Sequence, residues 1–148
     1  MRIHKDVEYA LIALSAMAKE KRKFTARELA ERFNIPYKLL TRILRQLGNT
    51  EMLESIQGAH GGYTLMKSAE DVSLGSIIEA VHGPEPVASC ISAGTECDQA
   101  AGCTIRGGIR QVQDLWEGVV NGMTLADFMG ENVLVTDRAD AAAASNFQ

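Results

Sequence analysis

Three cysteines in the second half of the chain are the residues best suited to chemistry. They are Cys90, Cys97 and Cys103, separated by six and five residues. Thiolates at such spacings on an irregular backbone can converge on one soft metal centre, and sulfur ligands select iron-sulfur clusters or zinc. The spacing is not the C-x-x-C of a zinc ribbon, so an iron-sulfur cluster is the first interpretation and zinc the second.

The surroundings of the cysteines argue against an inert, buried role. The neighbouring residues are largely polar, namely Ser89, Ser92, Thr95, Glu96, Asp98 and Gln99. An odd number of cysteines in a reducing compartment also disfavours a disulfide framework. Because a cluster normally takes one ligand more than three thiols supply, either a non-cysteine ligand or an open iron site is expected.

Charge is divided unevenly along the chain. Residues 1–67 carry 12 Lys and Arg against 7 Asp and Glu, whereas residues 68–148 carry 3 against 12. A basic half joined to an acidic half is typical of a DNA-facing module attached to one that stays away from DNA. The alternative is an accidental asymmetry among solvated helices.

The spacing of apolar residues predicts a mainly α-helical fold with a small β-wing. Helices are predicted over residues 5–19, 25–33, 36–48, 74–82, 105–120 and 124–128, and strands over 52–56 and 63–66 around a glycine-rich tip. Thr25 is expected to cap the second helix and Pro36 to open the third. Two short helices followed by a glycine-tipped hairpin are the order of a winged helix-turn-helix.

The third predicted helix would present a basic face to DNA, because its leucine and isoleucine stripe must turn inward. Arginines on that face suit guanine edges or phosphates, the lysine suits phosphate, and glycines let the wing tip approach a narrow groove. The predicted DNA-binding residues are Thr25, Tyr37, Lys38, Thr41, Arg42, Arg45, Gln57 and His60. An ordinary solvated helix face is the alternative.

The elements divide the chain into four parts. Residues 1–82 would form the winged helix-turn-helix domain, 83–104 a cysteine-bearing segment, 105–130 a dimerisation helix with a short terminal helix, and 131–148 a disordered tail. No apolar run is long enough for a bilayer and the N-terminus is too polar for a signal peptide, so we expect a cytoplasmic protein. We find no nucleophile–base pair or phosphate-cradling glycine motif that would indicate an enzyme.

These features together resemble the Rrf-two family of bacterial regulators, the group that includes the IscR, NsrR and RirA types. The similarity extends from residue 1 to about residue 130 and rests on residues 8–11, 36–40, 61–65, 72–74, the three cysteines and residues 115–127. It implies a homodimer built on the long helix near the C-terminus, with two winged modules set to read a palindromic operator in double-stranded DNA. The apolar stripe of residues 109–119 agrees with that implication.

The resemblance also implies a 2Fe-2S or 4Fe-4S cluster held by Cys90, Cys97 and Cys103, with a further ligand from elsewhere. In relatives this ligand is a histidine shortly after the third cysteine or an acidic residue of the partner's first helix. Arg106 stands where the histidine would be, so Glu8 is the predicted ligand. His4 and Asp6 are alternatives, and Glu8 could instead be an ordinary surface carboxylate.

The resemblance implies a repressor whose cluster state, set by iron, oxygen, nitric oxide or redox poise, changes the fit of the dimer to its operator. Gln57 departs from the arginine that many relatives carry in the wing, which affects the expected operator affinity. Two other functions are considered: the same DNA-binding dimer with a thiol or zinc switch, and an interaction module that sequesters a partner enzyme.

Overall fold

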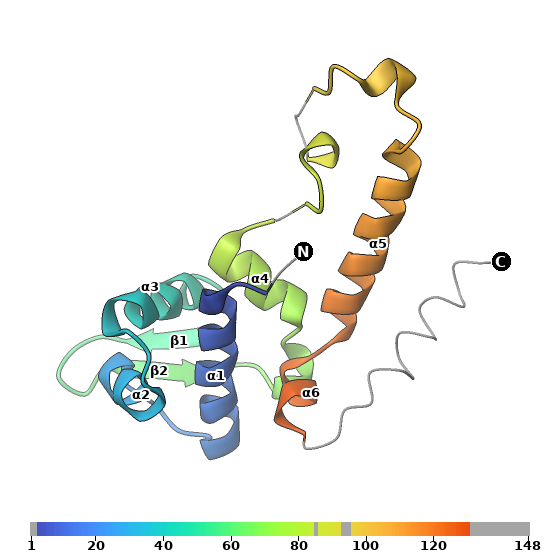
Figure 1. Ribbon diagram of the computed structural model, residues 1–148. Coiled ribbons are helices and arrows are strands. Elements are labelled where there is room, and N and C mark those ends of the chain that lie inside the picture. The colour runs from blue at the N-terminus through green and yellow to red at the C-terminus, as the bar shows by residue number, and fades with distance from the viewer. Residues whose placement is uncertain (1–2, 85, 93–95, 131–148) are drawn as a thin grey trace.

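The computed structural model describes residues 3–84, 86–92 and 96–130, and the chain is mainly helical with one small antiparallel sheet (Figure 1). The predicted tail of residues 131–148 lies outside the described residues. The elements are α1 (Lys5–Glu20), α2 (Ala26–Phe33), α3 (Tyr37–Gly48), β1 (Leu53–Ile56), β2 (Gly62–Leu65), α4 (Leu74–His82), α5 (Arg106–Gly122) and α6 (Leu125–Met129), with short 3-10 turns at Ala69–Asp71, Ser89–Ile91 and Ala100–Gly102. The predicted fold class is therefore confirmed.

The hydrophobic core lies between α1, α2, α3, the hairpin and α4. The inward stripe of α3 is completely buried, as are Leu14 of α1 and Ile77 of α4. Burying one such side chain contributes about 1.5–3 kcal/mol, so the stripe determines which face of α3 turns outward. Pro36 differs slightly from the prediction, because its ψ of 120° is extended and it precedes the first helical residue instead of occupying that position.

The wing is a hairpin to which the loop between α1 and α2 adds an edge. Strands β1 and β2 pair antiparallel from Leu53 opposite Leu65 to Ile56 opposite Gly62. On the other side of β2, the backbone of Tyr63 exchanges two hydrogen bonds with that of Phe24, at 2.7 and 3.0 Å. Phe24 is itself fully buried, so the wing is attached to the helical core by backbone pairing and by an aromatic anchor.

Gly62 is required for this attachment. Its φ is +152°, and an added Cβ would lie 2.7 Å from the carbonyl oxygen of Phe24 and 2.8 Å from Cγ of Lys23. We expect Gly62→Ala to lower the free energy of unfolding by about 1–3 kcal/mol, measured by denaturant titration. Gly102→Ala is the control, because no atom lies within 4 Å of its added Cβ. Equal stability of the two variants would contradict the proposed close contact.

Helix α5 rises away from the winged domain, and residues 83–104 connect the end of α4 to its far end (Figure 1). The base of α5 is fixed to the start of α4, where the N–H of Leu74 donates to the carbonyl of Met123 at 2.8 Å and that of Leu125 to Val72 at 2.7 Å. At the start of α6, the Asp127 carboxylate accepts hydrogen bonds from the N–H and the hydroxyl of Thr124, at 2.8 and 3.0 Å.

The apolar residues of α5 divide between two faces. Val120 is buried and Trp116 packs partly against the core. Val112, Leu115 and Val119 are exposed, with Leu115 52% accessible, and so is Ile105 directly before the helix. None of the helices in the described part of the chain has the length and apolar character needed to cross a membrane.

Candidate nucleic-acid interface and cysteine segment

A groove of about 540 Å³ lies between α3 and the wing. Five of the eight predicted DNA-binding residues line it, from the start of α2, the outward face of α3 and the wing: Thr25, Tyr37, Thr41, Arg45 and Gln57. Lys38, Arg42 and His60 lie outside this lining. The hollow therefore combines long donors with a glycine-rich wing, a combination suited to phosphates and base edges.

Two side chains at the start of α3, Tyr37 and Thr41, line the groove and are held by neighbouring groups. Tyr37 is 49% exposed, and the guanidinium of Arg27 lies 5.7 Å from the centre of its ring. The Thr41 hydroxyl donates to the carbonyl of Tyr37 at 2.8 Å, which fixes the rotamer of Thr41. Arg27 was missed by the sequence reasoning, although its outward position in the first turn of α2 was a usable signal.

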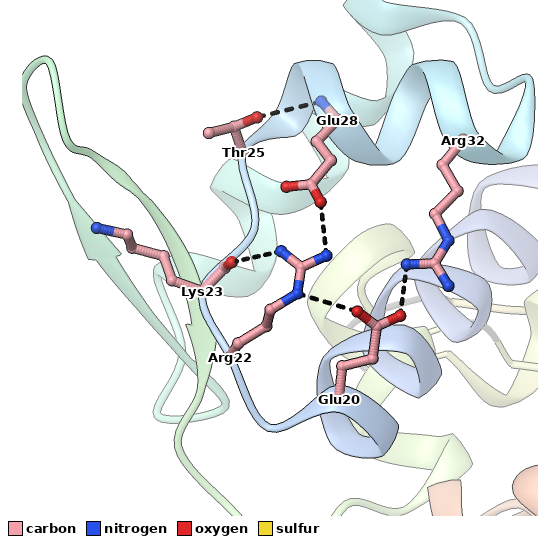
Figure 2. A network of polar contacts seen from close by, with 6 residues as sticks. All are labelled: Glu20, Arg22, Lys23, Thr25, Glu28 and Arg32. Carbon is pink, nitrogen blue, oxygen red and sulfur yellow. Dashed lines mark hydrogen bonds and ion pairs between the residues drawn. The ribbon is translucent and has the colours of Figure 1, made fainter.

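A network of charged side chains joins α1, α2 and the loop between them (Figure 2). Arg22 donates to Glu20 at 2.9 Å, to Glu28 at 2.6 Å and to the carbonyl of Lys23 at 3.2 Å, and its guanidinium lies 3.7 Å from the ring centre of Phe24. Arg32 of α2 also pairs with Glu20. The loop that supplies the extra edge of the wing is thus held from both neighbouring helices.

The same network keeps its carboxylates ionised. The hydrogen bond from Arg32 is the largest influence lowering the pKa of Glu20, and the bond from Arg22 plays that part for Glu28. The Thr25 hydroxyl accepts from the N–H of Glu28 at 3.1 Å, which confirms Thr25 as the cap of α2. Lys23 reaches the wing tip and donates to the carbonyl of His60. His60 therefore contributes its backbone to the structure of the wing.

Arg42 is placed differently from the other residues of the outward face of α3. It donates to Asp6 of α1 at 3.2 Å, and the second carboxylate oxygen of Asp6 lies 2.9 Å from Nε2 of His82. Burial acts to raise the pKa of Asp6, but the hydrogen bond from His82, a backbone hydrogen bond and the neighbouring His82 and Arg42 together outweigh it, so the pKa lies below its ordinary value. Arg42, one of the predicted DNA-binding residues, is thus engaged by a non-local ion pair while its side chain stays 58% exposed.

The three cysteines are free thiols, and each is partly buried. Cys90 lies in the turn Ser89–Ile91 and Cys103 directly follows the turn Ala100–Gly102. The Sγ of Cys97 lies 3.5 Å from Oε1 of Gln99. In residues 3–84, 86–92 and 96–130, no three His, Cys, Asp or Glu side chains lie close enough together to hold a metal ion.

Glu8, the predicted further ligand, lies on α1 and pairs with Lys5 at 2.6 Å. Its side chain is 45% exposed, so it is accessible to another molecule. The donor set suits an iron-sulfur centre chemically, because three soft thiols occupy one segment and a carboxylate is available on the surface. Within the described residues of one chain, these donors do not form a metal-binding group.

The outward face of α3, its groove and the attached wing define the class of this protein: a winged helix-turn-helix DNA-binding regulator. The family model described as "Rrf2: Iron-dependent Transcriptional regulator" matches residues 3–131. The chain therefore belongs to the Rrf2 family of transcriptional regulators, and it is not an enzyme.

Individual relatives agree with this assignment. An rrf2-like HTH-type transcriptional regulator of Rhodobacter capsulatus is 31% identical over 137 residues, covering 86% of this chain and 91% of the relative. The HTH-type transcriptional regulator NsrR of Geobacillus kaustophilus is 26% identical over 132 residues, covering 87% and 90%. The structure of CymR, the global cysteine regulator of B. subtilis, has a TM-score of 0.68 and 24% identity, covering 90% of this chain and 99% of that one.

Proposed function

We propose that this regulator is a homodimeric repressor that reads a palindromic operator and responds to iron, redox or nitric oxide status through an iron-sulfur cluster. The observation that carries the DNA-binding part is the groove between α3 and the wing, with Thr25, Tyr37, Thr41, Arg45 and Gln57 on its walls. Lys38 and His60 are proposed to contact DNA from outside the groove. The winged domain of residues 1–82, the cysteine segment 83–104 and the dimerisation region 105–130 are the proposed working units.

The exposed apolar stripe of α5 supports the homodimer. Val112, Leu115 and Val119 lie one helical turn apart and are 39–52% exposed, which is costly for residues of this kind unless a second surface covers them. A second copy supplies an identical stripe, and two-fold symmetry then matches the symmetry of a palindromic site.

The chemistry of the cysteine segment supports the cluster. Cys90, Cys97 and Cys103 are free and partly buried, and the family description itself includes dependence on iron. We propose these thiols as ligands, together with the accessible carboxylate of Glu8 from the second subunit. When bound, the cluster would supply a centre whose loss or oxidation alters the segment between α4 and α5.

An anaerobic purification tests the proposal directly. We expect a coloured protein whose sulfide content is close to its iron content, and whose affinity for a duplex selected from a random pool changes when the cluster is lost. A protein that stays colourless after reconstitution with iron and sulfide would contradict the cluster. Binding of the selected duplex by that colourless protein would leave the DNA-binding function intact.

One observation favours a second candidate, in which the cysteines form a thiol or zinc switch on the same DNA-binding dimer. The thiols are accessible enough to react and are not gathered into a metal-binding group in the described residues, which favours the thiol form of this switch over the zinc form. Zinc without sulfide in the purified protein, or a change of DNA affinity on mild oxidation without any metal, would support this candidate over the first.

The contribution of Arg45, which lines the groove, to sequence discrimination can be tested by substitution. Arg45→Ala is expected to reduce discrimination between the selected duplex and a scrambled one by about 1–3 kcal/mol, because a long bidentate donor is lost from the reading surface. Lys19→Ala is the control, since it removes the same charge from the exposed surface of α1. Fluorescence anisotropy with both duplexes measures the ratio. An equal effect of the two substitutions would show that only net charge matters.

A further inference from the structure

The outward face of α3 is divided between two environments. Arg45 and Thr41 line the groove beside the wing, whereas Arg42 turns to the other side and meets α1. There its guanidinium donates to Asp6 at 3.2 Å, and the Arg42 side chain remains 58% exposed while that of Asp6 is only 15% exposed. Arg42 therefore lies at the surface but is held by a largely buried carboxylate.

Asp6 has a second strong partner, and this partner lies at the end of α4. Nε2 of His82 is 2.9 Å from the other carboxylate oxygen of Asp6, and the ring of His82 lies 4.4 Å from that of His4. His82 is the last residue of α4, and Gly83 with φ of +81° begins the segment that carries the cysteines. One carboxylate thus joins the recognition helix to the point where the cysteine segment starts.

A second contact runs in parallel with the first. The side-chain amide of Gln46 donates to the carbonyl of Val81 at 3.0 Å, one residue before His82. Helix α3 is therefore attached to the last turn of α4 at two places, of which only the Asp6 contact involves a residue able to bind DNA. A displacement of this last turn would act on Arg42 through Asp6.

DNA phosphate and Asp6 compete for the same guanidinium. The pair with Asp6 turns the guanidinium toward α1 and partly neutralises its charge, and moving it fully to a phosphate would leave the carboxylate with one partner fewer in a poorly solvated position. The ion pair accordingly disfavours DNA contact by Arg42 as long as Asp6 is in place.

We propose that Asp6 is a positioning residue: its ion pair with Arg42 keeps the Arg42 guanidinium turned away from DNA. His82 binds the same carboxylate, so it connects this ion pair to the beginning of the cysteine segment. The inference rests on DNA binding by α3 as proposed above, and it does not depend on which metal or thiol chemistry the cysteines perform. Arg42 is then an adjustable contact, whereas Arg45 and Thr41 in the groove are permanent ones.

The test compares full-length wild type, Asp6→Asn, Arg42→Ala and the double variant on a duplex selected with the wild-type protein, over a range of salt concentrations. Asp6→Asn is expected to bind several-fold more tightly and to steepen the salt dependence by about 0.9 for each arginine that gains a phosphate. Arg42→Ala alone is expected to change little, because Arg42 is already held. In the Asp6→Asn background the same substitution should abolish the gain.

Controls separate this effect from simple charge and from folding. Glu31→Gln removes an equal charge from the exposed surface of α2 and is expected to leave the salt slope unchanged. His82→Leu removes the competing partner of Asp6, so it should strengthen the Asp6–Arg42 pair and weaken DNA binding, opposite in sign to Asp6→Asn. Thermal unfolding of each variant identifies any change in DNA binding caused by loss of fold.

The outcomes are distinct. An equal effect of Arg42→Ala in the two backgrounds would overturn the role of Asp6, and a gain in affinity for His82→Leu would overturn the connection through His82. A wild-type protein that selects no duplex would instead contradict the DNA-binding function itself, on which the inference rests.

Discussion

Replacement of Cys97 by alanine is expected to abolish the visible absorption and the iron and sulfide content of the anaerobically purified protein. Cys97 is one of three thiols proposed to hold the cluster, and its removal leaves too few soft ligands for a stable centre. The fold should be little affected, because Cys97 is only partly buried and lies outside the hydrophobic core. Absorption spectra and metal analysis measure the loss, and thermal unfolding tests the fold.

Ser92→Ala is the matched control for this substitution. It alters a partly buried polar residue of the same segment without removing a thiol, so colour and iron content should be retained. A Cys97→Ala protein that remains coloured and keeps its response on DNA would exclude the proposed ligand set.

Substitution of Leu115 by aspartate is expected to produce a monomer and to weaken binding of a palindromic duplex by about a hundred-fold or more. Leu115 is 52% exposed in the middle of the apolar stripe of α5, where a carboxylate would have to be desolvated against a second copy. Two linked modules bind a two-part site far more tightly than one, and that advantage disappears with the dimer. Sedimentation measures the association state, and anisotropy measures affinity.

Arg110→Gln provides the control, because it lowers the net charge by the same amount from an exposed position of α5. Residue 110 lies well around the helix from residue 115, since successive residues advance by about 100°. The control should remain a dimer. If Leu115→Asp also remains a dimer with unchanged affinity, the stripe does not form the interface.

Much of the winged domain could be predicted from the sequence because its signals are local. The stripe of Leu40, Ile43, Leu44 and Leu47 has the helical period, and all four are fully buried. The wing was recognisable from glycines between two short apolar runs. By contrast, the pairing of Phe24 with Tyr63 joins residues far apart in the chain, and no local pattern indicates it.

The candidate site was predictable to the same extent and for the same reason. Helical period and hairpin geometry identified the residues that line the groove, but they could not reveal which charges find partners elsewhere in the fold. Arg42 is the clear case, because its partner Asp6 is separated from it by 36 residues. The cysteine segment has no period at all, so its thiols were identifiable by type while their arrangement was not.

Helix α5 is fixed at its base, and farther along the helix Gln113 accepts a hydrogen bond from the N–H of Val87 in the cysteine segment at 2.7 Å. The backbone hydrogen bonds from Leu74 to Met123 and from Leu125 to Val72 form the fulcrum about which the helix would turn. From there the 17 residues of the helix extend about 25 Å to the cysteine segment. A rotation of a few degrees at the fulcrum moves the far end by ångströms. Because the cysteine segment contacts the helix at Gln113, a displacement of that segment is expected to reach the start of α4 through the base of α5, at the edge of the core that supports the recognition helix.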